Sequence, residues 1–229
     1  MEIKPIAHIR TEFPEKFGIP RQSGLAKTLR GRIVFEPEYR NPDALRGLEE
    51  FSHIWLIWEF SANRSTSSWQ PTVRPPRLGG NAHMGVFATR SPFRPNPLGL
   101  SCVRVDSIEL SSPDGPVINV FGADLMDGTP IYDIKPYIPY ADAHPEAKEG
   151  FTAQNQGYCL EVEKPEKIQK QLPPDKLKGL CGILAQDPRP SYQDDPERIY
   201  GFEYAGYEIK FRVSGNKLCV VEIENVRIS

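Results

Sequence analysis

The sequence predicts a mainly β protein, in which a small β-barrel N-terminal domain is followed by a small α+β two-layer domain. Short segments rich in β-branched and aromatic residues recur through the first two thirds of the 229 residues, separated by clusters of Gly, Pro, Asn and Asp. These segments do not alternate regularly with helical patterns, which favours a barrel or sandwich over a parallel sheet. With 39% hydrophobic and 25% charged residues, the chain can bury a core.

The first domain is expected to contain a series of short strands and one helix. The strands are predicted at residues 4–10, 31–36, 53–60, 82–89, 101–110, 117–122 and 132–135. The segment 53–60 is apolar on both sides, so we expect a central strand that is covered on both faces. Asn41 is a favourable N-cap and Pro42 suits a first helical position, with apolar residues at 45, 48 and 51 on one face.

The second domain is predicted from a shift in composition. Residues 141–156 are polar and poor in β-branched residues, and we place the domains at 1–145 and 146–229. Beyond the shift we expect a strand at 158–163, a helix that begins at Pro173 or Pro174, and a hairpin of residues 207–213 and 217–223. One helix against a small antiparallel sheet is an α+β unit.

Positive charge is concentrated in one interval of the chain. No acidic residue lies between Glu59 and Asp106, and the only charged residues there are arginines: Arg64, Arg74, Arg77, Arg90, Arg94 and Arg104. Guanidinium groups bind phosphate oxygens bidentately, so the interval predicts a phosphate-bearing partner. The alternative is that some of these arginines pair with carboxylates elsewhere in the fold.

Several protein classes are excluded by what the sequence lacks. No apolar run approaches the roughly 20 residues needed to span a bilayer, and the N-terminus does not resemble a signal peptide. The four cysteines form no CxxC pair, so we expect no zinc site and a reducing, cytoplasmic compartment. GxGxxG, P-loop, GxSxG and HExxH motifs are also missing.

Two segments carry candidate chemistry. The run from Arg90 to Gly99 holds three prolines, which restrict the backbone and would fix the directions of Arg90, Arg94 and Asn96. The Asp-Gly-Thr-Pro turn that begins at Asp127 follows the strand 117–122. The carboxylates of Asp124 and Asp127 could accept hydrogen bonds, act as a base or bind Mg²⁺. Alternatively, the segment could be only a turn.

Weaker signals lie elsewhere in the chain. The loop Arg21-Gln22-Ser23 could recognise an adenine edge, whereas His53 could equally be a core histidine. The loop between Arg74 and Arg77 is basic and stiffened by proline. In the second domain, Arg189 lies in a constrained loop that could stack on an unpaired base or could simply cap the preceding helix.

The run Arg90-Ser-Pro-Phe-Arg-Pro-Asn-Pro-Leu-Gly resembles the TsaA-like (TrmO) family of S-adenosylmethionine-dependent tRNA methyltransferases. The resemblance extends through Phe51-Ser-His-Ile-Trp, Gly85-Val-Phe-Ala-Thr and Asp127-Gly-Thr-Pro, and covers most of residues 3–140. Ala185-Gln-Asp-Pro-Arg-Pro is similar to a marker of the C-terminal extension of bacterial members.

This resemblance implies a barrel methyltransferase without a Rossmann core that works as a homodimer. It implies N6-methylation of threonylcarbamoyl-adenosine at position 37, with the tRNA anticodon stem-loop as partner. It further implies that the donor, S-adenosyl-L-methionine, is bound by Arg21, Gln22, Ser23, His53, Ile54, Arg90, Leu98, Asp124, Leu125, Met126 and Asp127. Ser23 stands where some relatives carry proline.

Roles can be assigned to the remaining candidates on the same basis. Asp127 is the candidate acceptor of the N6 proton. The RNA-binding candidates are Arg74, Arg77, Arg94 and Arg189. The competing hypotheses are a non-catalytic RNA-binding module with the same basic loops, and a metal-dependent phosphohydrolase that uses Asp124 and Asp127.

Overall fold

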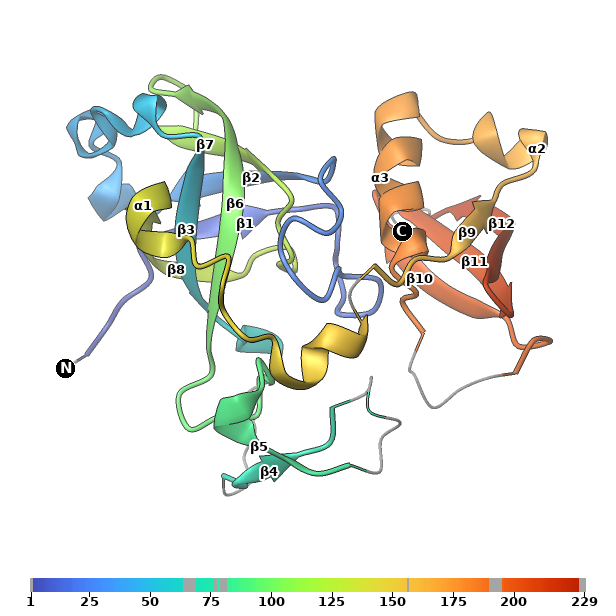
Figure 1. Cartoon of the computed structure of the whole chain (residues 1–229). Coiled ribbons are helices and arrows are strands. Elements are labelled where there is room, and N and C mark those ends of the chain that lie inside the picture. The colour runs from blue at the N-terminus through green and yellow to red at the C-terminus, as the bar shows by residue number, and fades with distance from the viewer. Residues whose placement is uncertain are drawn as a thin grey trace.

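The N-terminal part of the chain forms a closed barrel of six strands. The computed structural model describes residues 2–63, 69–75, 78, 82–155, 157–189 and 195–226. The barrel strands are β1 (Ala7–Arg10), β2 (Arg30–Phe35), β3 (His53–Glu59), β6 (Leu98–Glu109), β7 (Val117–Phe121) and β8 (Pro130–Pro136). They pair in the order β1-β2-β7-β6-β3-β8, with every neighbouring pair antiparallel, so the barrel seen in Figure 1 has no open edge.

Strand β3 shows how the barrel core is formed. Its residues alternate, with Ile54, Leu56 and Trp58 buried inside the barrel and the intervening side chains half-buried on the outside. The expectation that this segment is covered on both faces therefore holds for the inner face and only in part for the outer face. Part of that face is covered by α1 (Pro139–Asp142), where the Trp55 indole donates a hydrogen bond to Asp142 at 3.0 Å.

Two other predicted elements differ from the structure. The helix predicted after Asn41 is instead two short 3-10 helices, Pro42–Leu45 and Leu48–Glu50, because Gly47 between them adopts a left-handed conformation with φ of 85°. A third 3-10 helix, Pro37–Tyr39, precedes Asn41. Asn41 does act as an N-cap, accepting a hydrogen bond from the Asp43 N–H at 3.0 Å. The predicted strand 82–89 is only β5 (Met84–Gly85), which pairs with β4 (Thr72–Val73) and leads into a 3-10 helix.

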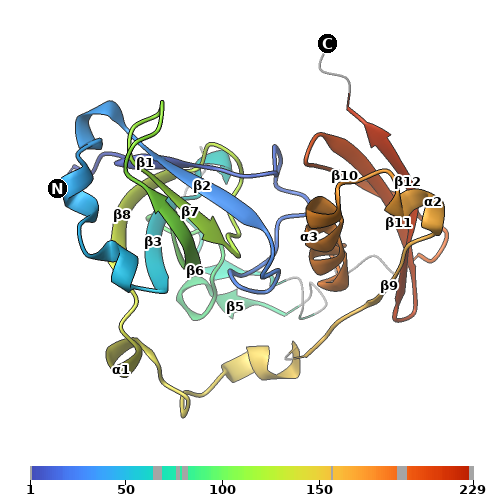
Figure 2. The same cartoon turned by 90° about the horizontal axis from the view of Figure 1, so that it is seen from above.

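The C-terminal part is a four-stranded sheet with a helix packed against it. The sheet contains β9 (Glu161–Glu163), β10 (Tyr200–Tyr204), β11 (Tyr207–Ser214) and β12 (Lys217–Asn225), in the order β10-β11-β12-β9. A short helix, α2 (Glu166–Gln169), follows β9. Helix α3 (Pro174–Ala185) lies between this sheet and the barrel, as Figure 2 shows. Strand β10 is an element that the sequence patterns did not predict.

The barrel and the C-terminal part each have a hydrophobic core of their own. The inward-facing barrel side chains form one buried cluster, and α3 with strands β10 to β12 forms another. The predicted fold class, a β-barrel followed by a small α+β unit, is confirmed. None of the described helices is long and apolar enough to cross a membrane.

Candidate active site

The loop of residues 21–24, between β1 and β2, lies against the end of β7, against Asp124 and against the proline-rich segment that carries Arg90. The Gly24 N–H donates to the Gly122 carbonyl at 2.9 Å, which holds the loop against the end of β7. Gly122 has φ of 78°, and a Cβ there would lie 3.3 Å from the Gly24 Cα. Glycine at 122 therefore lets the two backbones approach closely, and glycine at 24 suits a left-handed conformation with φ of 77°.

Asp124 lies next to this loop and is held by a chain of hydrogen bonds. The Ser101 hydroxyl donates to its Oδ1 at 2.6 Å, and the Trp58 indole donates to the Ser101 oxygen at 3.0 Å. The Ser23 backbone N–H is close enough to favour the ionised carboxylate and so lowers the pKa of Asp124. Burial raises the pKa of Asp124, while these hydrogen bonds and the nearby Arg90 charge partly oppose the rise.

Arg90 approaches the same loop from the proline-rich segment. Its Nη1 donates a hydrogen bond to the Gln22 side-chain oxygen. Arg94 turns back onto its own segment, where its Nη1 donates to the carbonyls of Thr89 at 2.8 Å and Ser91 at 3.3 Å. In this way the segment that presents Arg90 is held in shape by one of its own arginines.

The predicted donor-binding residues that follow Asp124 lie partly in the interior and partly at the surface. Leu125 is buried in the barrel core, and the Met126 carbonyl accepts a hydrogen bond from the Thr129 hydroxyl at 2.7 Å. The Asp127 Oδ1 accepts from the Thr11 N–H at 3.0 Å, and its Oδ2 lies 3.5 Å from Arg10 Nη1. The Asp127 side chain stays 39% exposed.

Three predicted donor residues have no described contact with loop 21–24. The His53 Nδ1 lies 2.9 Å from the Ser52 hydroxyl on the outside of β3. Ile54 is fully buried in the barrel core, and Leu98 is exposed at the start of β6. The part of the predicted donor set that the structure brings together is thus Arg21 to Ser23, Arg90 and Asp124.

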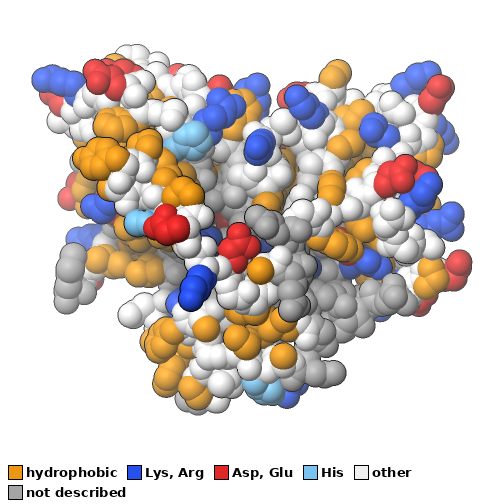
Figure 3. All heavy atoms as spheres, viewed as in Figure 1, with side chains coloured by type: hydrophobic (Ala, Val, Ile, Leu, Met, Phe, Trp, Pro, Cys, Tyr) orange, Lys and Arg blue, Asp and Glu red, His pale blue; other side chains and the backbone are white. Residues whose placement is uncertain are grey.

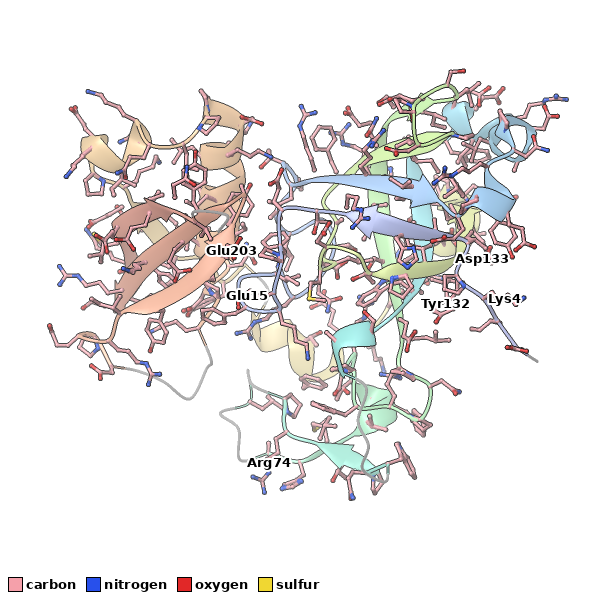
Figure 4. All side chains as sticks on the ribbon, turned by 180° about the vertical axis from the view of Figure 1, so that it is seen from behind. Lys4, Glu15, Arg74, Tyr132, Asp133 and Glu203 are labelled. Carbon is pink, nitrogen blue, oxygen red and sulfur yellow. The ribbon has the colours of Figure 1, made fainter. Side chains whose placement is uncertain are left out.

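The predicted RNA-binding arginines occupy different environments. Arg74 is exposed on the lobe that carries β4 and β5, where its Nε donates to His83 at 3.1 Å (Figure 4). Arg77 lies outside the described residues. Arg189 is only 8% exposed and is paired with Asp187. Their contacts with RNA stay predictions.

Ser101 and Trp58 belong to this site, although the sequence patterns did not single them out. Ser101 faces inward from β6 and is 1% exposed, among otherwise apolar barrel residues. A polar residue at an inward position of a strand is the signal that could have identified it, since buried hydroxyls need partners.

The arrangement suits a ligand that carries both charge signs. A half-buried carboxylate, the guanidinium of Arg90 and the amide of Gln22 converge on one loop. Among the described residues, no group of three or more His, Cys, Asp or Glu side chains is placed to hold a metal ion.

Comparison with known proteins places this barrel and its second domain in a class, the tRNA methyltransferases. A family model described as the tRNA-methyltransferase O N-terminal domain matches residues 8–143, and one described as the TrmO C-terminal domain matches residues 158–226. The chain therefore belongs to the tRNA-methyltransferase O family, and the resemblance noted in its motifs is confirmed.

Individual relatives are similar along almost the whole chain. An Escherichia coli tRNA (adenine(37)-N6)-methyltransferase is 39% identical over 221 residues, which cover 93% of each chain. A Pseudomonas aeruginosa relative with the provisional name S-adenosylmethionine-dependent methyltransferase is 43% identical and covers 87% of each chain. The crystal structure of Pseudomonas aeruginosa TrmO has a TM-score of 0.78 at 34% identity, covering 98% of this chain and 97% of that one.

Proposed function

We propose that this protein transfers a methyl group from S-adenosyl-L-methionine to N6 of threonylcarbamoyl-adenosine at position 37 of tRNA. Family membership supports a tRNA methyltransferase, and the relative from Escherichia coli carries the name of an adenine-37 N6-methyltransferase. The observation that carries the proposal is loop 21–24, which brings Arg90 and Asp124 together at one end of the barrel.

The residues around this loop fit the chemistry of the donor. S-adenosylmethionine has a sulfonium and an ammonium group, a carboxylate, ribose hydroxyls and an adenine. The Asp124 carboxylate suits a cationic group or a ribose hydroxyl, whereas the guanidinium of Arg90 suits a carboxylate. Gln22 and the loop backbone offer the donors and acceptors that an adenine edge requires.

The donor, when bound, supplies a methyl group on a positively charged sulfur. Displacement at that methyl requires the acceptor nitrogen in line, so the main task of this chain is to position two substrates. A partly dry site favours the loss of charge at sulfur during the transfer. We assign the N6 proton to Asp127, whose carboxylate is exposed enough to meet RNA and is held by Thr11.

The tRNA anticodon stem-loop is the proposed acceptor. The acid-free interval between Glu59 and Asp106 supports this assignment, since a phosphate backbone meets no carboxylate there. Arg74 is exposed on the lobe that carries β4 and β5 and is our first candidate for a phosphate contact.

We also propose a homodimer in the cytoplasm. Large hydrophobic side chains are exposed between residues 69 and 100, namely Trp69, Phe87, Phe93, Leu98 and Leu100. Figure 3 shows hydrophobic side chains gathered on the lower lobe, which carries β4 and β5 in Figure 1. Exposed apolar surface of this kind marks an interface. A monomeric mass at micromolar concentration, together with full activity, would refute the dimer.

Titration calorimetry with S-adenosylmethionine in the presence of EDTA tests the proposal. We expect saturable binding without metal, and weaker binding in Arg90→Ala, with Arg46→Ala as a control from an exposed surface pair. Binding of tRNA without any binding of the donor would favour the non-catalytic RNA-binding module. Hydrolysis of a phosphate ester that stops when EDTA is added would favour the metal-dependent phosphohydrolase.

A further inference from the structure

Part of the N-terminal segment folds with the C-terminal core rather than with the barrel. Phe13, Ala26 and Leu29, which lie between β1 and β2, belong to the same buried cluster as α3 and strands β10 to β12. Gly18 has φ of 91°, and a Cβ at this position would lie 2.3 Å from the Phe202 ring. The segment that contains loop 21–24 is therefore packed tightly against the second domain.

Polar contacts fix the same segment. The Ala205 N–H donates to the Glu12 carbonyl at 3.0 Å, and the Glu12 side chain forms an ion pair with Lys176 of α3. Glu15 and Glu203 lie side by side in Figure 4, where the Glu203 N–H donates to the Glu15 carboxylate at 3.3 Å. These contacts hold the chain on the approach to Arg21.

Arg21 itself contacts the second domain. Its Nη2 donates to the backbone carbonyl of Arg189 at 2.9 Å. Arg189 follows α3 in the Gln-Asp-Pro-Arg turn of residues 186–189, so the position of this carbonyl depends on the shape of the turn.

Asp187 sets the shape of the turn. It is one of two described non-glycine residues with positive φ, at 52°, a conformation that costs energy and persists only when surrounding contacts impose it. The Asp187 Oδ1 accepts from the Arg189 Nε at 2.9 Å. The Oδ2 accepts from the Arg189 Nη2 at 3.0 Å and from the Tyr158 hydroxyl at 2.9 Å. Burial alone would raise the pKa of Asp187, but these hydrogen bonds lower it, so the carboxylate stays ionised.

We propose that Asp187 is a positioning residue for methyl-donor binding: it holds the turn whose Arg189 carbonyl orients Arg21 in loop 21–24. The C-terminal domain then contributes to donor binding through this contact, without touching the donor. This inference rests on the proposed function, because it takes loop 21–24 to be part of the donor site. It also gives Arg189 a role inside the protein that is different from stacking on RNA.

The test compares Asp187→Asn with wild type in the full chain. Asparagine tolerates the left-handed conformation but cannot accept both hydrogen bonds from the Arg189 fork. We expect the Kd and KM for S-adenosylmethionine to rise on the order of tenfold, as for loss of one hydrogen bond to a charged group. We expect kcat and the KM for tRNA to stay within twofold of wild type.

A matched control removes charge from the same domain away from this contact. Glu222 accepts a hydrogen bond from Lys210 on the sheet at 2.9 Å, and Glu222→Gln should leave donor binding unchanged. Combining Asp187→Asn with Arg21→Ala should weaken donor binding no further than Arg21→Ala alone, because both changes act through one contact. If Asp187→Asn does not fold, Tyr158→Phe removes one of the hydrogen bonds to Asp187 more mildly and should raise the donor KM in the same direction.

Three results would overturn the inference. One is a lower melting temperature with an unchanged donor Kd, which would make the turn merely structural. Another is a higher KM for tRNA with an unchanged KM for the donor, which would make it an RNA contact. The third is full additivity with Arg21→Ala. If wild type itself fails to bind S-adenosylmethionine, the proposed function fails instead.

Discussion

Ser101→Ala should destabilise the protein out of proportion to the single oxygen atom that it removes. Ser101 is 1% exposed, and its hydroxyl both donates to Asp124 at 2.6 Å and accepts from the Trp58 indole at 3.0 Å. Losing a hydrogen bond to a charged group costs about 1.5–3 kcal/mol, and a buried donor left without an acceptor costs about 1–3 kcal/mol. Since neighbouring effects do not add fully, we expect the free energy of unfolding to fall by about 3 kcal/mol.

Urea unfolding at pH 7.5 measures this change directly. The control is Ser107→Ala on the same strand, where the exposed hydroxyl accepts from Asn119 at 3.0 Å and Asn119 keeps a second partner in Glu109. The control should stay within about 0.5 kcal/mol of wild type. A loss below about 1 kcal/mol for Ser101→Ala would refute the reasoning, because the hydroxyl would then not be holding Asp124 and Trp58.

Three further predictions concern carboxylates and arginines. Burial raises the pKa of Asp124, so the stability that its protonated form contributes is complete below the unfolded-state pKa and is lost as pH rises through the folded-state pKa. Asp124→Asn should therefore have a higher melting temperature than wild type at pH 8 and lose that advantage below about pH 3.9, which melting curves can check. It should also bind the donor more weakly, which calorimetry can check. Asp127→Ala should weaken donor binding or turnover, and wild-type values for both would remove it from the site. Arg74→Ala should weaken tRNA binding and flatten its log–log salt slope by about 0.7–1, whereas Arg94→Ala should lower the melting temperature instead, because Arg94 bonds the backbone of its own loop.

Strand patterns predicted most of the barrel because one physical rule dominates there. In a closed barrel every second side chain points inward, and β3 shows this alternation in its burial, although its sequence is apolar on both faces. The prediction of one helix after Asn41 was wrong because Gly47, in a left-handed conformation, separates the 3-10 helix Pro42–Leu45 from the 3-10 helix Leu48–Glu50. The predicted strand 82–89 was wrong because a run of apolar residues does not distinguish a strand from a 3-10 helix.

The candidate site was only partly predictable, for a different reason. Motifs identified Arg90 and Asp124, since their segments have distinctive compositions. Ser101 acts through its position inside the barrel, and Phe13 packs into a domain that begins more than a hundred residues later. Contacts of this kind depend on the tertiary fold, so no local pattern in the sequence indicates them.

Nucleoside analysis after methyl transfer tests the central claim most directly. The purified protein is incubated with methyl-labelled S-adenosylmethionine and with tRNA that carries threonylcarbamoyl-adenosine at position 37, and the tRNA is then digested to nucleosides. The account predicts label in a single product, the N6-methylated threonylcarbamoyl-adenosine, and a marked loss of that label with Arg90→Ala. Label in any other nucleoside, or no label although both donor and tRNA bind, would contradict it.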